Sequence, residues 1–470
     1  MLKVRSFIYI TGFTLLFFLF LLFTSCSDST TEVSPAAKSP LPTLTQTPSG
    51  TVINTSIPTP VPTPTPMPTP TPTPTQPPII KVATASIGAT GDILMHEKLY
   101  KSGYDATTST YNYDHIFPWF SKYVSEVDYA VANLEVTLAG DDNGYKYSGY
   151  PRFNCPDAIV DSLKKAGFDM LLTANNHSYD TGITGFMRTQ EILRNRGVTY
   201  IGTRYKEEDK NYTVQNINGI NVGMICYTFN TEIINDKQVK LNGITLNAQA
   251  TALTNSFNTS HLENFYLKLK DEVAKMKADG AQALVIFIHW GKEYVTTNNS
   301  TQKKIAQKLC NLGFDVIVGN HPHVAQPVEL FTSTVNDNHK TLCLYSTGNA
   351  VSNIRYSSTR PIHCEDGMLF TFTFAKYSDG TVLVESARVL PIWVNRYTDP
   401  ILDRYTYEIL TLDKNIMDWK MHMNLTDSLL LKCQDSYKRT MAIVSSGLEE
   451  ANKYYSDNQK EVEQKLGVLN

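Results

Sequence analysis

An apolar strand runs directly into a polar loop in the segment Phe314-Asp315-Val316-Ile317-Val318-Gly319-Asn320-His321-Pro322-His323. A short apolar run that ends at a glycine is typical of a strand buried on both faces. The two histidines flank Pro322, beside which the backbone tends to be extended, so both imidazoles can face neighbouring metal positions. The segment therefore predicts a buried sheet whose strand ends carry metal-binding side chains.

Other segments repeat this order of strand, loop and helix. Predicted strands cover 84–90, 128–133, 168–174, 281–288, 314–318 and 342–345, and predicted helices cover 157–166, 262–278 and 302–312. Unalternating strands separated by helices predict a sheet that is covered on both faces. A hairpin signal at 378–380, between apolar runs 367–375 and 381–390, makes the sheet mixed. The tail from about Asn424 is predicted to be helical.

Polar side chains recur at the carboxyl ends of the predicted strands. They are Asp92, His96, Glu135, Asn176, His177, His289, His321 and His323. In α/β sheets, ligands bind at this edge. Imidazole and carboxylate groups together suit Zn, Mn or Fe better than Ca. We therefore predict a metal site here, where Asp180 either orients His177 or caps the helix that starts near Ile183.

The charge balance excludes one large class of partners. The chain has 470 residues and a formal net charge of −3 at pH 7. An electrostatic nucleic-acid binder needs a basic excess that displaces phosphate counterions, so no nucleic-acid partner is expected. Without the apolar N-terminus and the Pro-rich tract that follows it, residues 79–470 are still ample for a large core.

The N-terminus resembles an export signal of a bacterial lipoprotein. Lys3 and Arg5 precede an apolar run over 7–23, and Thr24 and Ser25 lead to Cys26. We predict cleavage before Cys26 and lipidation of its thiol; the alternative is an uncleaved transmembrane anchor. Either reading places the rest of the chain at the extracytoplasmic face of the cell membrane.

A Ser/Thr/Pro-rich linker follows the predicted lipidation site and extends to residue 78. Proline removes backbone donors and fixes φ, which favours polyproline II over a packed structure. This linker is predicted to hold the domain off the membrane, in or beyond the cell wall. The six other cysteines show no zinc-finger spacing, and Cys226, Cys310 and Cys343 are expected to be buried free thiols.

Six ordered motifs between about Ala85 and Asn353 resemble those of the capsule-synthesis CapA family (poly-γ-glutamate biosynthesis, PgsA-like). They are Gly91-Asp92-Ile93-Leu94-Met95-His96, Asn133-Leu134-Glu135, Asn175-Asn176-His177-Ser178-Tyr179-Asp180-Thr181-Gly182, His289-Trp290-Gly291-Lys292-Glu293-Tyr294, Gly319-Asn320-His321-Pro322-His323-Val324-Ala325-Gln326 and Tyr345-Ser346-Thr347-Gly348-Asn349. That family is similar to the calcineurin-like metallophosphoesterases. The resemblance implies an α/β fold, a four-layer α/β/β/α sandwich with mixed sheets and C-terminal helices.

The resemblance also implies a domain order and a two-metal centre. The predicted parts are a lipoprotein signal peptide (1–25), lipidated Cys26 with a Thr/Pro-rich linker (26–78), a CapA-like metallophosphoesterase-like domain (79–400) and a helical extension (401–470). The implied ligands of two divalent metal ions are Asp92, Glu135, Asn176, His289, His321 and His323, with His96 as an additional candidate. Glu135 stands where metallophosphoesterases have a metal-bridging Asp.

The remaining motif residues receive roles in catalysis or substrate binding. His177 is implied to contact a phosphate and act as general acid, with Asp180 beside it. The candidate substrate contacts are Asn175, Trp290, Glu293, Tyr294 and Asn349. Trp290 and Tyr294 lie beside His289 and Glu293 and could stack on a polymer, although most aromatic residues at this density belong to a core.

The resemblance implies an extracytoplasmic protein that acts in synthesis, export or attachment of an anionic capsular polymer such as poly-γ-glutamate, together with a membrane-bound polymer synthase. A second hypothesis is two-metal hydrolysis of a phosphoester or cell-envelope polymer. A third is a noncatalytic module in which metals and Lys292 or Arg355 hold carboxylates. Binding a polyanion and binding a phosphate require similar cationic centres. The sequence therefore leaves open whether the chain is an enzyme.

Overall fold

The computed structural model describes residues 79–231, 239–357, 359–414 and 416–465. The predicted signal peptide, Cys26 and the Thr/Pro-rich linker lie outside these residues. Within them, no helix combines the length and the apolar character that crossing a membrane requires.

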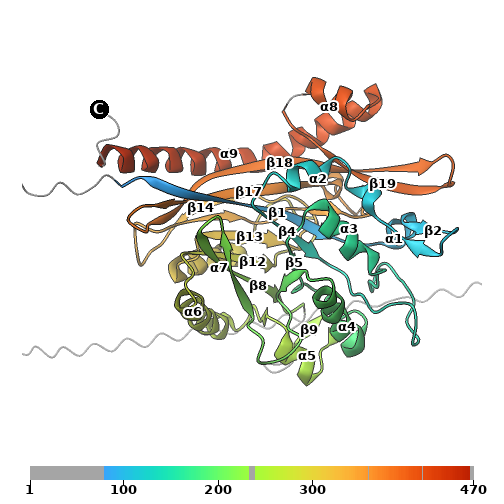
Figure 1. The fold of residues 1–470 in the computed structure, drawn as a ribbon, viewed down its shortest axis with the longest axis horizontal. Coiled ribbons are helices and arrows are strands. Elements are labelled where there is room, and N and C mark those ends of the chain that lie inside the picture. Colours follow the sequence, from blue (N-terminus) through green and yellow to red (C-terminus); the bar gives the residue numbers. More distant parts are fainter. Residues whose placement is uncertain (1–78, 232–238, 358, 415, 466–470) are drawn as a thin grey trace, which may run out of the picture. The chain divides into compact units, whose positions relative to one another are not determined.

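The first sheet is mixed and contains eight strands among the described residues (Figure 1). Its order is β19-β18-β17-β1-β4-β5-β6, and β16 pairs with the end of β1. The bounds are β1 (Lys81–Ile93), β4 (Tyr129–Leu134), β5 (Met170–Leu172), β6 (Thr199–Ile201), β16 (Asn349–Val351), β17 (Asp366–Tyr377), β18 (Val382–Asp399) and β19 (Arg404–Thr411). Strands β1, β4, β5 and β6 are parallel, whereas β17, β18 and β19 continue as an antiparallel meander.

The second sheet contains seven strands of the described chain, in the order β11-β8-β12-β13-β15-β14 with β7 paired to β8. The bounds are β7 (Tyr212–Ile217), β8 (Ile220–Phe229), β11 (Ser256–Phe257), β12 (Ala283–His289), β13 (Val316–Asn320), β14 (Val328–Thr332) and β15 (Lys340–Leu344). Strands β8, β12, β13 and β15 are parallel, which brings their carboxyl ends to one edge.

Helices and short hairpins complete the chain. The helices are α1 (Glu97–Ser102), α2 (Phe120–Val124), α3 (Ala158–Ala166), α4 (Gly182–Asn195), α5 (Ala248–Leu253), α6 (Leu262–Ala278), α7 (Ser300–Leu312), α8 (Ile416–His422) and α9 (Asp427–Lys465), with 3₁₀ turns at Asp114–Ile116 and Ile362–Glu365. Two small hairpins pair β2 (Tyr104–Asp105) with β3 (Thr110–Tyr111) and β9 (Lys240–Leu241) with β10 (Ile244–Thr245).

Three apolar layers confirm the predicted four-layer sandwich. The layer between the sheets includes Ile87, Phe287 and Phe370. Outside the first sheet, a second layer includes side chains of α1, α2 and α3, and outside the second sheet a third layer includes side chains of α6 and α7. Each fully buried Leu, Ile or Phe contributes about 1.5–3 kcal/mol to folding, so these layers dominate the stability.

Strand alternation decides which side chains face the space between the sheets. In β12, Val285 and Phe287 belong to the layer between the sheets, whereas Ile286 and Ile288 face α6 and α7. Because side chains alternate along a strand, His289 follows the inward positions and Trp290 the outward ones. His289 and Trp290 are neighbours in the sequence, but this alternation places their side chains on opposite faces of the second sheet.

The C-terminal region differs from its prediction in one respect. Residues 401–470 were expected to be helical, but β19 lies within this range and pairs with β18 along its whole length. The long helix α9 then follows and runs along β18 (Figure 1). Its Val444, Ala451 and Tyr455 side chains join the apolar layer between the sheets.

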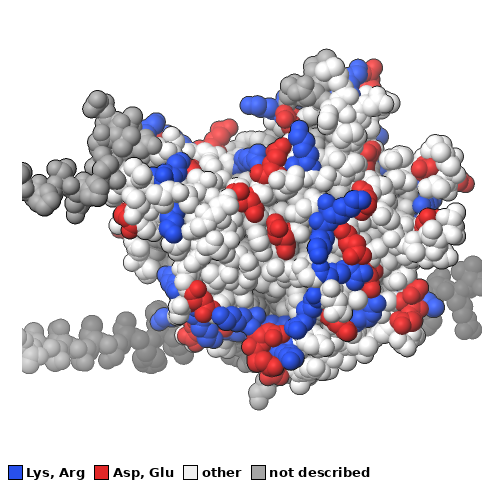
Figure 2. All heavy atoms as spheres, viewed as in Figure 1, with Lys and Arg blue, Asp and Glu red and all other residues white. Residues whose placement is uncertain are grey.

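All six cysteines of the described residues are free and buried, which confirms the prediction for Cys226, Cys310 and Cys343. Burial raises the pKa of the Cys226 thiol to about 12, so these groups are unreactive at neutral pH. The face drawn in Figure 2 carries Lys and Arg side chains close to Asp and Glu side chains.

Candidate metal centre

The predicted ligands gather where parallel strands of both sheets end. Asp92 is the penultimate residue of β1, Glu135 follows β4 and His289 is the last residue of β12. His321 and His323 follow β13 directly. All five side chains are buried between the two sheets' carboxyl edges.

A local irregularity turns Asp92 toward this centre. The pairing of β1 with β4 shifts between Thr90 and Asp92, so the alternation of β1 changes there. Gly91 lies so close to Gly348 that a Cβ atom would stand 1.8 Å from the Gly348 carbonyl oxygen. Only glycine fits this close approach of the two chains, which explains the Gly91-Asp92 pair of the first motif.

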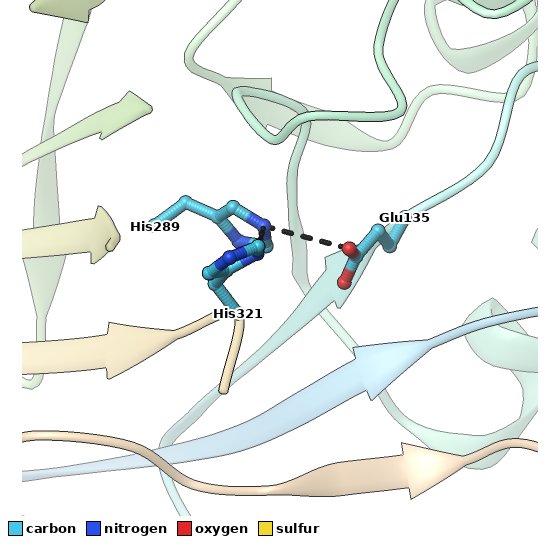
Figure 3. Close-up of side chains that lie close together, drawn as sticks. All are labelled: Glu135, His289 and His321. Carbon is cyan, nitrogen blue, oxygen red and sulfur yellow. Dashed lines mark hydrogen bonds and ion pairs between the residues drawn. The ribbon is translucent and has the colours of Figure 1, made fainter. Parts of the chain in front are cut away.

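One group of candidate ligands contains Glu135, His289 and His321 (Figure 3). The Nε2 atom of His289 lies 3.4 Å from Oε1 of Glu135 and 3.1 Å from Nδ1 of His321. The side-chain oxygen of Asn176 also lies 2.7 Å from Nε2 of His289. One candidate ligand atom from each of the three residues can be chosen so that all lie within 4.8 Å of one another.

A second group contains Asp92, Glu135 and His323, so Glu135 belongs to both. The Nδ1 atom of His323 lies 2.9 Å from Oδ2 of Asp92 and 3.1 Å from Oδ1 of Asn349. The amide of Asn133 donates to Oδ1 of Asp92 at 2.8 Å and to Oε2 of Glu135 at 3.2 Å. With Nδ1 occupied by these oxygens, Nε2 of His323 is the nitrogen available to a ligand.

The backbone beside Pro322 differs from its prediction. An extended backbone was expected, but φ is +96° at His321 and +56° at His323. Residues other than glycine rarely adopt such positive values, which cost about 1–3 kcal/mol each. The two imidazoles still belong to different groups of candidate ligands, although the backbone conformation expected to separate them is wrong.

Burial and mutual charge set the protonation of the two carboxylates. Burial and the charge of Asp92 raise the pKa of Glu135 well above its usual value. Burial alone would raise the pKa of Asp92, but its hydrogen bond to His323 and the charge of that ring hold it below the usual value. The pair therefore carries opposing pKa shifts, as closely spaced buried acids do.

The three histidines also differ from one another. Burial lowers the pKa of His289 to about 3 and that of His321 well below its usual value, so both rings are neutral at pH 7. Burial acts on His323 too, but the hydrogen bond and charge of Asp92 raise its pKa. Neutral imidazoles have the free electron pairs that metals bind.

The residues present fit divalent metal ions. Among the described side chains of this centre, Oε1 of Glu135 and Nδ1 of His289 are buried without a hydrogen-bond partner. An unpaired buried carboxylate oxygen is costly unless something positive compensates it. Two carboxylates and three imidazoles that converge in this way match the ligand preferences of Zn, Mn or Fe.

His177 and Asp180 form a separate pair beside this centre. The Nδ1 atom of His177 lies 2.7 Å from Oδ2 of Asp180, which also accepts from the backbone N–H of Phe153 at 2.7 Å. The helix cap predicted as an alternative is not formed, because Thr181 is the residue before α4. Asp180 therefore orients His177 and holds the proton on its Nδ1.

The sequence did not point to Asn242, which lies in the turn between β9 and β10. Its amide donates to Oδ1 of Asp180 at 2.8 Å and to the Pro151 carbonyl oxygen at 2.7 Å. It thus holds the carboxylate that orients His177. The only sequence feature at this position is the pair Asn242-Gly243, which predicts a turn. A turn signal does not predict which distant residue the asparagine side chain contacts.

His96 lies outside both groups of candidate ligands. Its ring meets the edge of Phe153 with a centroid distance of 5.1 Å, and Phe153 meets His177 at 4.7 Å. Burial lowers the pKa of His96 to about 4. The structure therefore gives His96 a place in the wall around His177 and not among the clustered ligands.

Three of the five predicted substrate contacts have structural partners instead. The indole of Trp290 is 2% exposed and donates to the Tyr345 carbonyl oxygen at 2.9 Å, so it packs against α7 and offers no open stacking face. Asn175 donates to Oδ1 of Asn133 and to the Leu134 carbonyl oxygen. Asn349 is buried as well and donates to main-chain oxygens.

The other two substrate candidates remain accessible. Glu293 is exposed, and the half-buried ring of Tyr294 lies 6.0 Å from the His323 ring. Tyr294 has φ of +63°, and its backbone N–H donates to the Pro322 carbonyl oxygen at 2.8 Å. These two residues border the candidate centre on the side of the second group.

Relatives in two bacilli resemble this chain. The "Capsule biosynthesis protein CapA" of Bacillus anthracis is 29% identical over 273 residues, which cover 57% of this chain and 60% of that protein. The "PGA biosynthesis protein CapA" of Bacillus subtilis (strain 168) is 26% identical over 344 residues, covering 72% and 80% of the two chains. The chain thus spans less than two thirds of the Bacillus anthracis relative.

A solved Staphylococcus aureus chain named as a 5′-nucleotidase also matches, with a TM-score of 0.40, 14% identity, and coverage of 68% of this chain and 56% of that one. The family model for "Bacterial capsule synthesis protein PGA_cap" matches residues 86–354, which is more than half of the chain and contains every clustered candidate ligand. This chain therefore belongs to the bacterial capsule synthesis protein family PGA_cap.

Proposed function

We propose that this protein acts at the outer face of the cell membrane in the synthesis, export or attachment of an anionic capsular polymer of the poly-γ-glutamate type. The family and the names of the two bacillar relatives support this role. The predicted lipid on Cys26 would anchor the chain in the membrane, and the Thr/Pro-rich linker would hold the folded domain at a distance from it. At about 3.1 Å per residue, roughly 50 residues in polyproline II extend to on the order of 150 Å.

One observation carries the proposal of a metal centre. Glu135 is shared by two groups of buried ligands, and its Oε1 atom has no hydrogen-bond partner among the described residues. Asp92 and His323 would complete one site, and His289 and His321 the other, with Asn176 beside His289. Divalent metals bound there would supply Lewis-acid chemistry and positive charge for anionic groups.

The charge balance makes a local centre necessary for such a polymer. A net charge of −3 provides no broad basic surface that could attract a polyanion. Two divalent ions held by two carboxylates and neutral imidazoles would leave a positive excess at one edge of the sandwich. A membrane-bound polymer synthase is the proposed partner that would supply or receive the chain.

A second candidate function is hydrolysis of a phosphoester or cell-envelope polymer, and the His177–Asp180 pair favours it. Asp180 holds the proton on Nδ1 of His177, so Nε2 is the nitrogen that exchanges a proton with a substrate. In this reaction His177 would protonate the leaving group, and Asp180 would stabilise the charged ring. A purely binding role would not need this oriented pair.

Metal analysis of the purified full-length protein, after growth with Mn, Fe and Zn, tests the centre. We expect about two metal ions per chain, and a loss in His321→Ala that the control variant His422→Ala, at an exposed histidine of α8, does not show. Protein without metal would contradict the proposal. Deletion of the gene should abolish the capsular polymer, and Cys26→Ser should abolish incorporation of labelled fatty acid.

An assay with phosphodiester and γ-glutamyl substrates separates the two candidate functions. Turnover that His177→Asn abolishes at unchanged metal content would favour the hydrolase. Stoichiometric metal with no turnover of either substrate class, together with binding of poly-γ-glutamate, would favour the role in polymer handling. The noncatalytic binding module predicts the second result as well, but without a capsule defect that depends on His177.

A further inference from the structure

Arg360 is a cation at the border of the candidate metal centre that has no acidic partner. It is half-buried, and its guanidinium forms no hydrogen bond or ion pair with the described residues. None of its nitrogen atoms is among the buried polar atoms that lack a partner, so the group is accessible to a ligand. Glu365, an acid of the same segment, lies instead 3.9 Å from Arg355 and accepts from the Tyr356 N–H at 3.2 Å.

The Tyr294 ring positions this guanidinium beside the centre. The guanidinium carbon lies 5.7 Å from the centre of the Tyr294 ring, which lies 6.0 Å from that of the His323 ring. Arg360 is therefore within about 12 Å of a ring that belongs to the second group of candidate ligands. Tyr294 is itself held, because its backbone N–H donates to the Pro322 carbonyl oxygen at 2.8 Å. A cation over a fixed ring loses less entropy when an anion binds.

The charge of Arg360 acts on two parts of the candidate centre. Burial is the main reason that the pKa of His96 falls to about 4, and the positive charge of Arg360 lowers it further. Burial and the Glu293 charge raise the pKa of Tyr294, whereas the Arg360 charge opposes this rise. His96 belongs to the wall around His177, and Tyr294 borders the second group. Arg360 thus adds positive charge where both parts meet the surface.

The repeat of the proposed polymer fits the distance between Arg360 and the centre. Each residue of poly-γ-glutamate contributes five backbone bonds, so an extended chain advances about 6 Å per residue. Each residue also carries one free carboxylate. When one carboxylate lies at the metal centre, a carboxylate one or two residues away can therefore reach the guanidinium. The planar fork of arginine pairs with both oxygens of such a group.

We propose that Arg360 is a specificity-determining residue, which binds one carboxylate of the polymer while a neighbouring carboxylate occupies the metal centre. This inference rests on the proposed function, since it assumes that an anionic polymer reaches that centre. With one contact at the metals and another at Arg360, the site would favour anionic groups that repeat along a chain over a single small anion. The Tyr294 ring would form the wall between the two contacts.

The first test measures binding of labelled poly-γ-glutamate to the metal-loaded full-length protein. Arg360→Met should weaken binding about tenfold at unchanged metal content, because a charge-assisted pair is lost. Arg360→Lys should recover only part of the affinity, since it lacks the fork. The control Arg388→Met removes an exposed arginine of β18 and should stay within about twofold. Unchanged binding in Arg360→Met would overturn the proposal.

A second readout distinguishes a direct contact from an effect through the fold. Loss of a contact between charges should make binding less sensitive to added salt, whereas a disturbed fold would leave the salt dependence as in the wild type. Arg360→Met should also keep the wild-type free energy of unfolding to within about 1 kcal/mol, because it removes only a contact with an aromatic ring. Weaker binding with an unchanged salt dependence would contradict the proposed contact.

The second experiment follows Arg360 in the wild type. Phenylglyoxal modifies accessible arginines, and mass spectrometry of peptides from the treated full-length protein reports Arg360 and Arg388 separately. Poly-γ-glutamate should slow the modification of Arg360 several-fold and leave that of Arg388 unchanged. Equal protection of the two arginines would contradict a specific contact with Arg360.

The same reagent separates this inference from the function on which it rests. If the metal-loaded protein binds poly-γ-glutamate without protection of Arg360, the inference is wrong and the proposed function stands. If poly-γ-glutamate does not bind but poly(glycerol phosphate) protects Arg360, the residue is an anion ligand and the carboxylate polymer is wrong. If neither polymer binds, both the inference and the proposed function are wrong.

Discussion

Two clusters of buried charge, each with a residue from the first sheet, differ in how completely their polar atoms are paired. In the cluster that attaches α9, Asp366 accepts from Ser436 at 2.6 Å and from Arg439 at 2.8 and 2.6 Å, so both carboxylate oxygens are satisfied. In the candidate metal centre, Oε1 of Glu135 and Nδ1 of His289 have no hydrogen-bond partner in the described part of the chain. One cluster is closed within the chain, and the other is open to a ligand.

The difference separates a structural role from a functional one. A buried charge that its own chain satisfies fixes the position of an element, here the long helix against the start of β17. A buried charge that its chain leaves unsatisfied costs stability unless a ligand binds. If this distinction is right, a substitution in the open cluster should lower metal content and stabilise the metal-free protein. A substitution in the closed cluster should leave metal content unchanged and destabilise the protein.

The largest effect is expected from Glu135→Gln, which should remove most of the bound metal because Glu135 belongs to both groups of ligands. The metal-free variant should nevertheless be more stable than the metal-free wild type. Burial and the Asp92 charge raise the pKa of Glu135, so its ionised form is unfavourable in the fold. Elemental analysis and urea unfolding after chelation measure the two effects.

Glu293→Gln is the matched control, because Glu293 is an exposed carboxylate near the centre that belongs to neither group. It should keep both the metal content and the stability of the wild type. Retention of two metals by Glu135→Gln would refute the shared ligand. A less stable metal-free Glu135→Gln would show that the carboxylate is satisfied without metal.

The next effect is expected from Arg439→Met, which leaves the buried Asp366 carboxylate without its main partner. Loss of one partner of a buried ion pair typically costs about 3–5 kcal/mol, and this loss should appear in the free energy of unfolding. Metal content should not change, since Arg439 contacts no candidate ligand in the described structure. A parallel loss of metal would mean that the two clusters are coupled, contrary to the comparison.

The sequence indicated which side chains gather in the candidate metal centre, because parallel strands bring their carboxyl ends to one edge. Asp92, Glu135, His289 and His321 all follow apolar runs, so their assembly required only the topology of the sheets. The alternation along β12 also separates His289 from Trp290, and a stricter use of this period would have assigned Trp290 to the core.

Other features depend on contacts that no local pattern encodes. Asn242 reaches Asp180 only because the β9–β10 turn folds back over the loop after β5, 62 residues away in sequence. The positive φ at His321 opposes the usual preference of a residue before proline, and the positive φ at His323 is rare for any residue other than glycine, so both arise from tertiary packing. The strand β19 was missed because its apolar alternation is short and lies beside a helical tail.

The pH dependence of stability provides a third test of the open cluster. Burial holds the pKa values of His96 at about 4 and His289 at about 3, below the unfolded value near 6.5, and that of His321 is also lowered. Below about pH 6.5 the unfolded chain therefore binds more protons than the folded one, and stability falls as the pH falls. The raised pKa values of His323 and of the carboxyl groups of Glu135, Asp315 and Asp366 oppose part of this loss.

From pH 7.5 to 5.5 each of the three histidines should cost the metal-free protein about 1.4 kcal/mol, or about 4 kcal/mol together. Urea unfolding at the two pH values measures the difference. His96→Gln should reduce the loss by about 1.4 kcal/mol while leaving the clustered ligands intact. An equal loss in His96→Gln and the wild type would mean that the His96 ring is solvated or already protonated in the fold.

The smallest effect is expected from Trp290→Phe. This variant tests whether Trp290, the residue next to His289, has a structural role in the core or contacts the substrate. The variant keeps an aromatic ring beside Tyr345 but leaves the Tyr345 carbonyl oxygen without the indole donor, at a cost of about 1–3 kcal/mol in the free energy of unfolding. Polymer binding and metal content should stay as in the wild type, because the indole faces α7. Weaker binding of poly-γ-glutamate at full metal content would restore Trp290 as a substrate contact and would show that pairing within the chain does not by itself exclude a functional role.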